Sequence, residues 1–362
     1  MKFSIKKILA FILLIFILIT FFSGTVFAMQ ETSTAVVIEA SGLKGVSPTY
    51  QTVKLKITSG NFKGRIFTIK NQTAGNYAYD MVVKKGDRVS VYIKEQNGNI
   101  NVFIIDFYHQ NYILYLTLFF LALLILVGKG KGIKAILTLS FTIFIIIKII
   151  LPAILLGYNS ILVTIIFSTV IIVVSMLIIA GFNNKSIAAI LGTLGGVLLA
   201  GFIAYFVEKK MGLTGFSSDE VAELIMNMPQ QIDIKNLIFP GIILGALGAV
   251  MDVSISIASA EDEIYKANNN LSTKELFLAG MNVGRDVMGT MANTLILAYA
   301  GSSMALLFLF VVYQSSVQDI VNMDIVANEI VRSLAESSGL VASIPLTAIL
   351  SSILITREKK QS

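Results

Sequence analysis

The sequence predicts an all-α helical bundle in a membrane, preceded by a small N-terminal β-rich domain outside the membrane. Of the 362 residues, 55% are hydrophobic and only 14% are charged. A soluble domain carries about 25% charged residues. The charges also cluster between long apolar runs, and each run is long enough to cross a hydrocarbon core about 30 Å thick. We expect about seven such crossings in the mature chain.

The composition argues against several kinds of site. The chain has no cysteine, which excludes disulfides and thiolate metal sites, and its single histidine is His109. We therefore expect no metal centre and no cofactor. An enzyme is the least favoured class, because no HExxH motif and no Ser/His pairing supports one. The net charge of +6 lies largely beside apolar runs, so it indicates membrane orientation and not a nucleic-acid partner.

Residues 1–28 have the pattern of a secretion signal. Lysines precede an apolar run, and Val26-Phe27-Ala28 fits a signal-peptidase site. An uncleaved signal anchor stays open as the alternative, since the run is just long enough to span.

Residues 29–111 are predicted to form the extracytoplasmic β-rich domain. Apolar and polar residues alternate over 53–57 and 89–93, and this period of two is typical of half-buried strands. Four to six short strands would make a small barrel or sandwich. The turns are expected at Gly60-Asn61, Gly86-Asp87 and Asn97-Gly98.

Residues 112–356 are predicted to be the helical transmembrane domain, followed by a cytoplasmic tail at 357–362. Lysine-bearing segments at 129–134, 183–186 and 259–285 all fall on the same side as this tail. The positive-inside rule then places the C-terminus in the cytoplasm and residues 29–111 outside a bacterial plasma membrane. The predicted spans are 112–128, 133–156, 160–182, 187–207, 237–258, 293–313 and 338–355.

The two long outer loops, 208–236 and 314–337, each carry a helical pattern. Ser217 and Glu220 form a capping box in the first, and Asp324 begins the second. We expect two amphipathic helices on the outer membrane surface. Together with their neighbouring spans they would form a weak parallel repeat, unless the two loops acquired their helices independently.

Apart from Lys134 at the very end of its span, only Lys148 and Asp252 carry charge inside the predicted spans, and a charge in hydrocarbon is costly. Lys148 is close enough to the outer end of its span to snorkel. Asp252 is too short to do so. It begins a polar stripe that continues through Ser256, Ser259 and Glu263 at helical spacing toward the cytoplasm.

The apolar stretch 276–313 is too long for one straight span. We expect a broken or re-entrant element at 276–292, with an amphipathic cytoplasmic helix as the alternative. Polar residues recur along it at helical spacing, and Arg285 and Asp286 could pair with Asp252 or with the acids at 261–263. The predicted ion- or substrate-binding residues are Asp252, Ser256, Asn282, Arg285, Asp286, Asn293 and Thr294, with Glu261, Glu263 and Lys148 as secondary candidates.

Two of these segments resemble a known family. GALGAVMDVSISIA at 245–258 and NVGRDVMGTMANTLILAYAG at 282–301 closely resemble signature stretches of the YibE/F-like family of bacterial multi-spanning membrane proteins. GDRVSVYI at 86–93 and Ile344-Pro345 also fit. The resemblance implies a signal or anchor, an extracytoplasmic β domain and a helical membrane core. It brings no assigned substrate or catalytic residue.

Two functions follow from the predicted site. In a permease or transporter, the oxygens of Asp252, Asp286 and Asn293 would bind a cation or relay protons, and Arg285 would neutralise excess charge or bind an anionic group. In a non-transporting membrane component, the polar residues would only lock helices together, while the β domain docks a partner or an envelope polymer. The expected partners are the lipid bilayer, an unidentified ion or small solute, and a second membrane subunit or a second copy of the chain.

Overall fold

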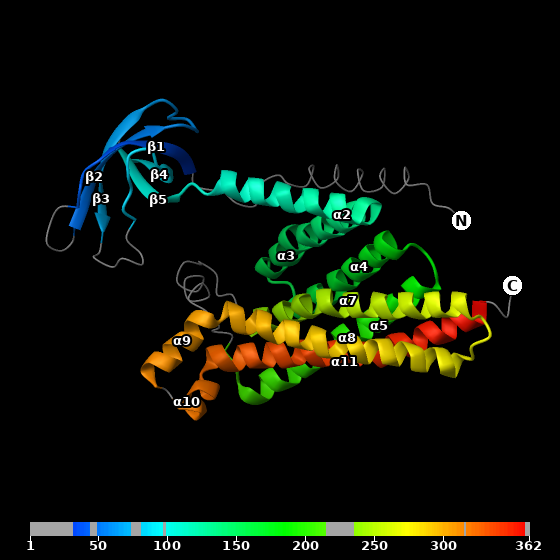
Figure 1. The fold of residues 1–362 in the computed structure, drawn as a ribbon. Coiled ribbons are helices and arrows are strands. Elements are labelled where there is room, and N and C mark those ends of the chain that lie inside the picture. Colours follow the sequence, from blue (N-terminus) through cyan, green and yellow to red (C-terminus); the bar gives the residue numbers. More distant parts are fainter. Residues whose placement is uncertain are drawn as a thin grey trace. The chain divides into compact units, whose positions relative to one another are not determined.

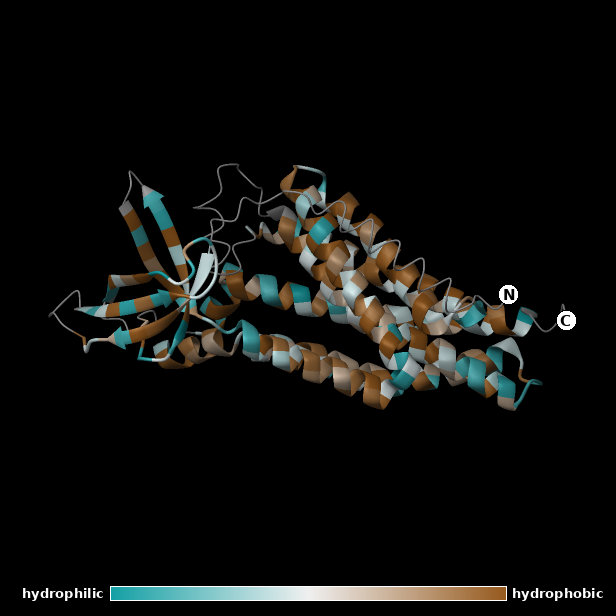
Figure 2. Ribbon diagram, turned by 90° about the horizontal axis from the view of Figure 1, so that it is seen from above, coloured by the Kyte–Doolittle hydropathy of each residue, from teal (hydrophilic) through white to brown (hydrophobic). Residues whose placement is uncertain are grey.

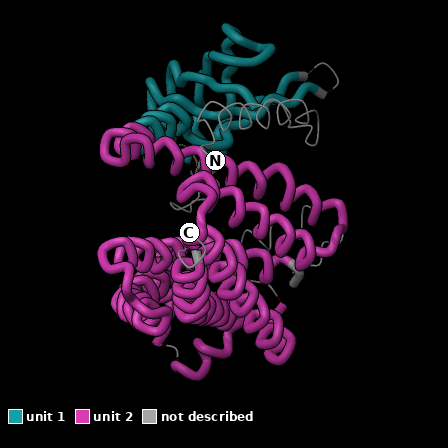
Figure 3. The backbone as a smooth tube through the Cα atoms, turned by 90° about the vertical axis from the view of Figure 1, so that its right-hand side faces the viewer, with its two compact units in different colours: residues 1–120 teal, residues 121–362 magenta. Residues whose placement is uncertain are grey.

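The computed structural model describes residues 32–43, 49–73, 81–96, 99–214, 235–314 and 316–358. The chain divides into two compact units, residues 1–120 and 121–362 (Figure 3), which we describe separately. Three predicted features lie outside the described residues: the signal segment at 1–28, the turn at Asn97-Gly98 and the capping box of Ser217 and Glu220.

The first unit contains one five-stranded antiparallel sheet with the order β3-β2-β1-β4-β5 (Figure 1). The edge strands β3 and β5 also approach each other, so the sheet curls toward a barrel, which is one of the two arrangements that the sequence left open. The strands are β1 (Thr32–Ala40), β2 (Thr49–Ile57), β3 (Ile66–Thr73), β4 (Arg88–Gln96) and β5 (Asn99–Phe107).

The alternation predicted from the sequence is confirmed in the core of this sheet. Val53, Leu55 and Ile57 are at most 1% exposed. The turn glycines Gly60 and Gly86 adopt φ of 78° and 95°, a region in which a side chain would be strained. Two polar residues, Ser33 and Gln51, are also buried in the described part of this domain. Gln51 Nε2 donates to the carbonyls of Ser41 and Val83 at 2.9 and 2.8 Å.

The rest of the described chain is helical. Figure 2 shows these helices as mostly hydrophobic, whereas the strands alternate between hydrophobic and hydrophilic residues. The helices are α2 (Gln110–Ile145), the π-helical η1 (Ile146–Ile150), α3 (Leu151–Leu155), α4 (Ser160–Ala180), α5 (Asn184–Met211), α7 (Lys235–Ala267), α8 (Thr273–Ser302), α9 (Met304–Tyr313), α10 (Val317–Asn322) and α11 (Asp324–Glu358).

Within the described residues, five helical stretches are long and apolar enough to cross a membrane, or six if the bent pair α8–α9 counts as one span. The first stretch, Gln110–Leu155, has 46 residues and would measure about 69 Å if straight. It is interrupted at Lys129, where φ is 46° and ψ is −126°. The backbone of Leu124 lies against Gly132, which shows that the chain reverses its direction at Lys129. The reversal falls at the start of the predicted loop 129–134, while the number of crossings stays a prediction.

Glycine contacts give the relative directions of the packed helices. Gly241 and Gly245 of α7 face Arg332 and Glu336 of α11 in the same order along both helices, so α7 and α11 run parallel. Helix α5 runs antiparallel to α11, since its Gly192 faces Thr347 and the later Gly196 faces Gly339. These close approaches are the small-residue packing expected of membrane helices.

Polar contacts gather at one end of this bundle. Lys134 Nζ donates to the carbonyl of Ile179 at 3.1 Å, and Lys185 Nζ lies 3.1 Å from Asp262 Oδ2. The hydroxyls of Thr273 and Thr356 are 2.9 Å apart. Segments that the sequence places on one side of the membrane therefore meet at one end of the bundle. Which side that end faces stays a prediction.

Two predicted elements are wrong. The outer helix that begins at Asp324 is not a separate surface element, because α11 continues without interruption to Glu358 and buries Ala327, Val331 and Ala335. Nor does a break occur at 276–292: α8 is continuous there, and the chain bends by 64° only between α8 and α9. Helix α11 also contains Pro345 in its interior.

Candidate functional site

Apart from Glu261, the residues predicted to bind an ion or substrate lie on the surface of the helical unit. Asp252 and Ser256 are exposed on α7, and Lys148 is exposed in η1. The sequence pattern therefore identified polar helix faces and not an enclosed site. The exposed candidates on α8 are Asn282, Arg285, Asp286, Asn293 and Thr294, and Glu263 is exposed on α7.

Few of these side chains meet. Arg285 Nη1 donates to Asn282 Oδ1 at 3.1 Å, and Glu263 pairs with Lys266 at 2.8 Å. Among the described residues, Arg285 forms no ion pair with Asp252 or with the acids at 261–263, so the predicted pairing is wrong for this conformation.

The enclosed polar groups lie deeper, where two carboxylates are completely buried. Glu261 of α7, a secondary candidate, and Glu336 of α11 are both 0% exposed. Burying an ionised carboxylate costs several kcal/mol or more unless it is paired. These two side chains are therefore the most costly polar groups in the described part of the bundle.

Glu261 has no hydrogen-bond partner for either carboxylate oxygen. It lies against Gly280 of α8, where a side chain would overlap the carboxylate. The hydroxyl of Ser351 on α11 lies beside it without a well-formed hydrogen bond. Three helices thus enclose an acid that none of them neutralises.

The next two residues show how unusual this environment is. Asp262 Oδ2 lies 3.1 Å from Lys185 Nζ and 2.9 Å from Lys266 Nζ. Glu263 is exposed and also pairs with Lys266. The two lysines therefore neutralise the neighbours of Glu261 and leave Glu261 itself unpaired.

Glu336 has a different environment at the opposite end of the bundle. One of its carboxylate oxygens accepts a hydrogen bond from the hydroxyl of Tyr299 of α8, and the other oxygen has no partner. Gly245 of α7 leaves room for this carboxylate. Arg332 lies near enough to act on Glu336 electrostatically, although its own ion pair is with Glu329 at 3.8 Å.

Buried hydroxyls separate the two carboxylates along α11. Ser343, Thr347 and Ser351 are each 0% exposed and follow Glu336 at helical spacing, so they share its face of the helix. The hydroxyls of Thr347 and Ser351 have no hydrogen-bond partner. We call Glu336, Ser343, Thr347 and Ser351 the α11 polar line. Its last member lies beside Glu261, about 22 Å from Glu336 along the axis.

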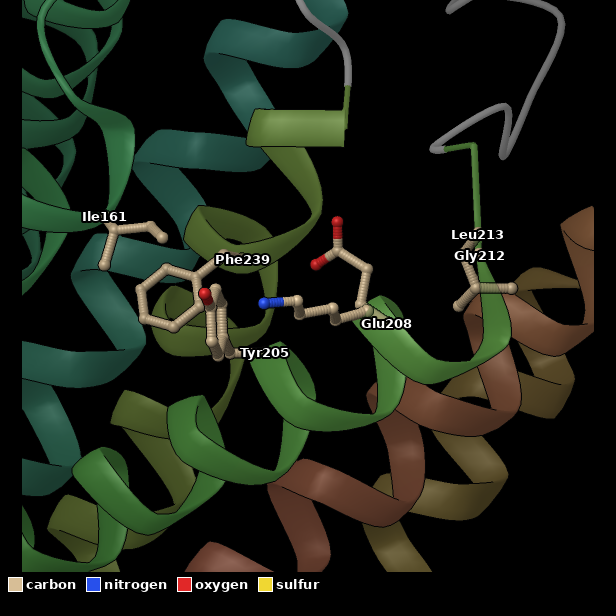
Figure 4. Close-up of a pocket in the computed structure, with 7 residues that line it drawn as sticks. Ile161, Tyr205, Glu208, Gly212, Leu213 and Phe239 are labelled. Atoms are coloured by element: carbon tan, nitrogen blue, oxygen red, sulfur yellow. The ribbon is translucent and has the colours of Figure 1, made fainter.

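A separate cavity of about 310 Å³ lies near the C-terminal end of α5 (Figure 4). It contains none of the predicted site residues and no member of the α11 polar line. Its lining combines apolar and charged side chains: Ile161, Tyr205, Glu208, Lys209, Gly212, Leu213 and Phe239.

Sequence reasoning missed Glu336, Tyr299 and Arg332. The charges at 329–336 made this segment resemble an outer loop. The signal that could have identified it is the run of small residues one turn apart, Ala327, Val331, Ala335, Gly339 and Ser343, which continues directly into the last predicted span.

A small antiparallel β domain joined to a series of long apolar helices defines a multi-pass membrane protein. The model of the YibE/F-like protein family matches residues 116–357, and the model of the YibE/F family N-terminal domain matches residues 24–107. The chain therefore belongs to the YibE/F-like family. A search of curated proteins and a search of solved structures each returned no match.

Proposed function

We propose that this protein is a permease or transporter that moves an ion or a small solute across the membrane. The observation that carries the proposal is the complete burial of Glu261 and Glu336 with carboxylate oxygens that lack partners. Ionisable residues within membrane segments are rare, and they mark ion or substrate pathways more often than they support packing.

A purely structural role accounts less well for this arrangement. Buried polar groups that stabilise a fold are hydrogen-bonded, and Glu261 is not. A hydrophobic residue of similar size at position 261 would pack without the desolvation cost. The α11 polar line adds support, because it provides further oxygen groups between the two acids.

In the proposed function, the exposed polar stripe that begins at Asp252 is a route for the ion or solute between the interior of the bundle and the cytoplasmic surface. Asp252 and Ser256 are one turn apart on α7, and the same helix carries Glu261. Polar groups on a helix face favour contact with water or with another subunit over contact with lipid.

The test is flux through the purified protein in liposomes. Ion and small-solute gradients are screened for the native chain and for Glu261→Gln, Glu336→Gln and Asp252→Asn. The control is Glu95→Gln, which removes an exposed acid from β4, outside the proposed site and route. We expect flux in the native chain, its loss in both buried-acid variants, and normal flux in the control.

Two outcomes count against the proposal. Absence of flux in the native chain under every gradient would favour the non-transporting role, with the β domain docking a partner or an envelope polymer. Normal flux in folded Glu261→Gln and Glu336→Gln would remove both acids from the pathway. Monodisperse gel filtration of each variant shows that it is folded.

A further inference from the structure

We infer that the ion is the proton and that Glu261 carries it, in the neutral carboxylic acid form, in the conformation described here. This inference rests on the proposed transport function and names its ion.

The cations near Glu261 are already paired with other acids. Lys185 of α5 and Lys266 of α7 both lie within 3.1 Å of Asp262 Oδ2, one residue from Glu261. Both lysines pair with the more exposed acids and leave the buried Glu261 without a cation, which is the arrangement expected if Glu261 carries no charge.

The helices packed around Glu261 bring apolar or neutral residues against it. Helix α8 contributes Gly280 and the buried Leu276, and α11 contributes the neutral Ser351. On α7 itself the nearest charged residues are Asp262 and Glu263, which are both paired. Lys185 is the charged residue that α5 brings to this end. Among the described residues, no charged group pairs with Glu261.

The side chains around Glu261 favour a proton over a metal cation. Hard cations prefer sites with several carboxylate or carbonyl ligands. In the described part of the chain no three His, Cys, Asp or Glu side chains are grouped as ligands, and the polar side chain that α11 places beside Glu261 is the neutral Ser351. A proton needs only one carboxylate oxygen, and it converts a buried ion into a polar group that is much less costly to bury.

Glu336 is the second acid that fits this role. It accepts a hydrogen bond from Tyr299 and lies near Arg332, so its anionic form is better stabilised than that of Glu261. Glu261 releases its proton, and a proton taken up by the Glu336 carboxylate then passes along the α11 polar line to the Glu261 carboxylate. Both carboxyl groups thereby return to their starting states. Transport by this route involves no other reactant.

The experiment is infrared spectroscopy of the full-length protein in lipid, without any gradient. A protonated carboxylic acid gives a C=O stretch distinct from the carboxylate bands, and the stretch shifts in D₂O. We expect this stretch in the native protein at neutral pH and its loss in Glu261→Gln. It should persist in the control Glu263→Gln, and a shifted stretch should return in Glu261→Asp.

Several results would overturn the inference. The stretch could be missing from the native protein, or it could persist in folded Glu261→Gln. A response of the Glu261 carboxylate bands to added sodium at constant pH would assign the site to an alkali cation. If the native protein shows flux but lacks this C=O stretch, the transport function is supported and the proton on Glu261 is rejected. The stretch without any flux would leave a protonated Glu261 and remove transport, and with it the proton as the transported ion.

Discussion

Gly280 of α8 lies directly against the carboxylate of Glu261 of α7, so that a methyl group at position 280 would overlap the carboxylate. The same relationship recurs at the other end of the bundle, where Gly245 faces Glu336. Each completely buried acid thus occupies space that a glycine on a neighbouring helix provides. The packing of α7 against α8 and α11 therefore depends on a glycine beside each buried acid.

Gly280→Ala should therefore destabilise the protein. Overpacking costs about 1–3 kcal/mol, which exceeds the gain in helix propensity of about 1 kcal/mol. Thermal unfolding in detergent measures the effect. Gly289→Ala on the same helix is the control, because no atom lies within 4 Å of the added group, and this variant should be neutral or stabilised. Equal behaviour of the two variants would refute the close contact with Glu261.

Tyr299→Phe should leave Glu336 without its hydrogen-bond donor. A buried acceptor deprived of its partner costs about 1–3 kcal/mol, and we expect a lower unfolding temperature. Tyr313→Phe is the control, since Tyr313 is 73% exposed. In a background that already carries Glu336→Gln, the cost of Tyr299→Phe should become smaller. An unchanged cost in that background would show that the Tyr299 hydroxyl acts elsewhere.

Lys129→Gly should stabilise the reversal within α2. Lys129 has φ of 46° and ψ of −126°, which glycine adopts freely, while a side chain there costs about 1–3 kcal/mol. Lys131→Gly removes the same charge from a helical position and should instead cost about 1 kcal/mol. The two variants are compared by thermal unfolding. The expected signs are opposite, and a loss of stability in both would contradict the reversal at Lys129.

Gln51→Leu should weaken the β domain. Gln51 is 3% exposed, its Nε2 donates to Val83 O at 2.8 Å, and its Oε1 accepts from Val83 N at 3.1 Å. Leucine would leave both Val83 groups unpaired, at a cost of about 1–3 kcal/mol. Faster hydrogen exchange at the Val83 amide is the specific measurement. Gln72→Leu on β3, where the side chain is exposed, should leave this exchange unchanged.

Local patterns in the sequence predicted the elements well. The period-two runs at 53–57 and 89–93 lie in β2 and β4 with their apolar side chains buried. Such patterns depend only on neighbouring residues and on which face is buried. The apolar runs likewise fall in helices α2 to α5, α7 and α11, because hydropathy reports directly on burial in lipid or protein. The predicted span 293–313 instead covers the end of α8 and all of α9, with the 64° bend inside it.

Predictions that depended on packing failed. The break predicted at 276–292 is absent, and α8 passes through Gly280 and Gly284. Each of these glycines makes room for a side chain from another helix, Glu261 and Ile344. Glu336 looked like a loop residue, but packing against Gly245 and Tyr299 buries it. A single sequence does not show which glycine of one helix faces which acid of another.

Pro345 has a mechanical consequence for α11. Proline has no amide hydrogen, so the carbonyl of Val341, four residues earlier, lacks its helical hydrogen bond. This weak joint lies between Ser343 and Thr347, midway along the α11 polar line. Glu336 and Ser351 therefore lie in separate halves of α11, on either side of Pro345. A displacement of the N-terminal half of α11, which carries Glu336, would bend the helix at Pro345. The geometry beside Glu261 could then stay fixed while the opposite end of the bundle moves.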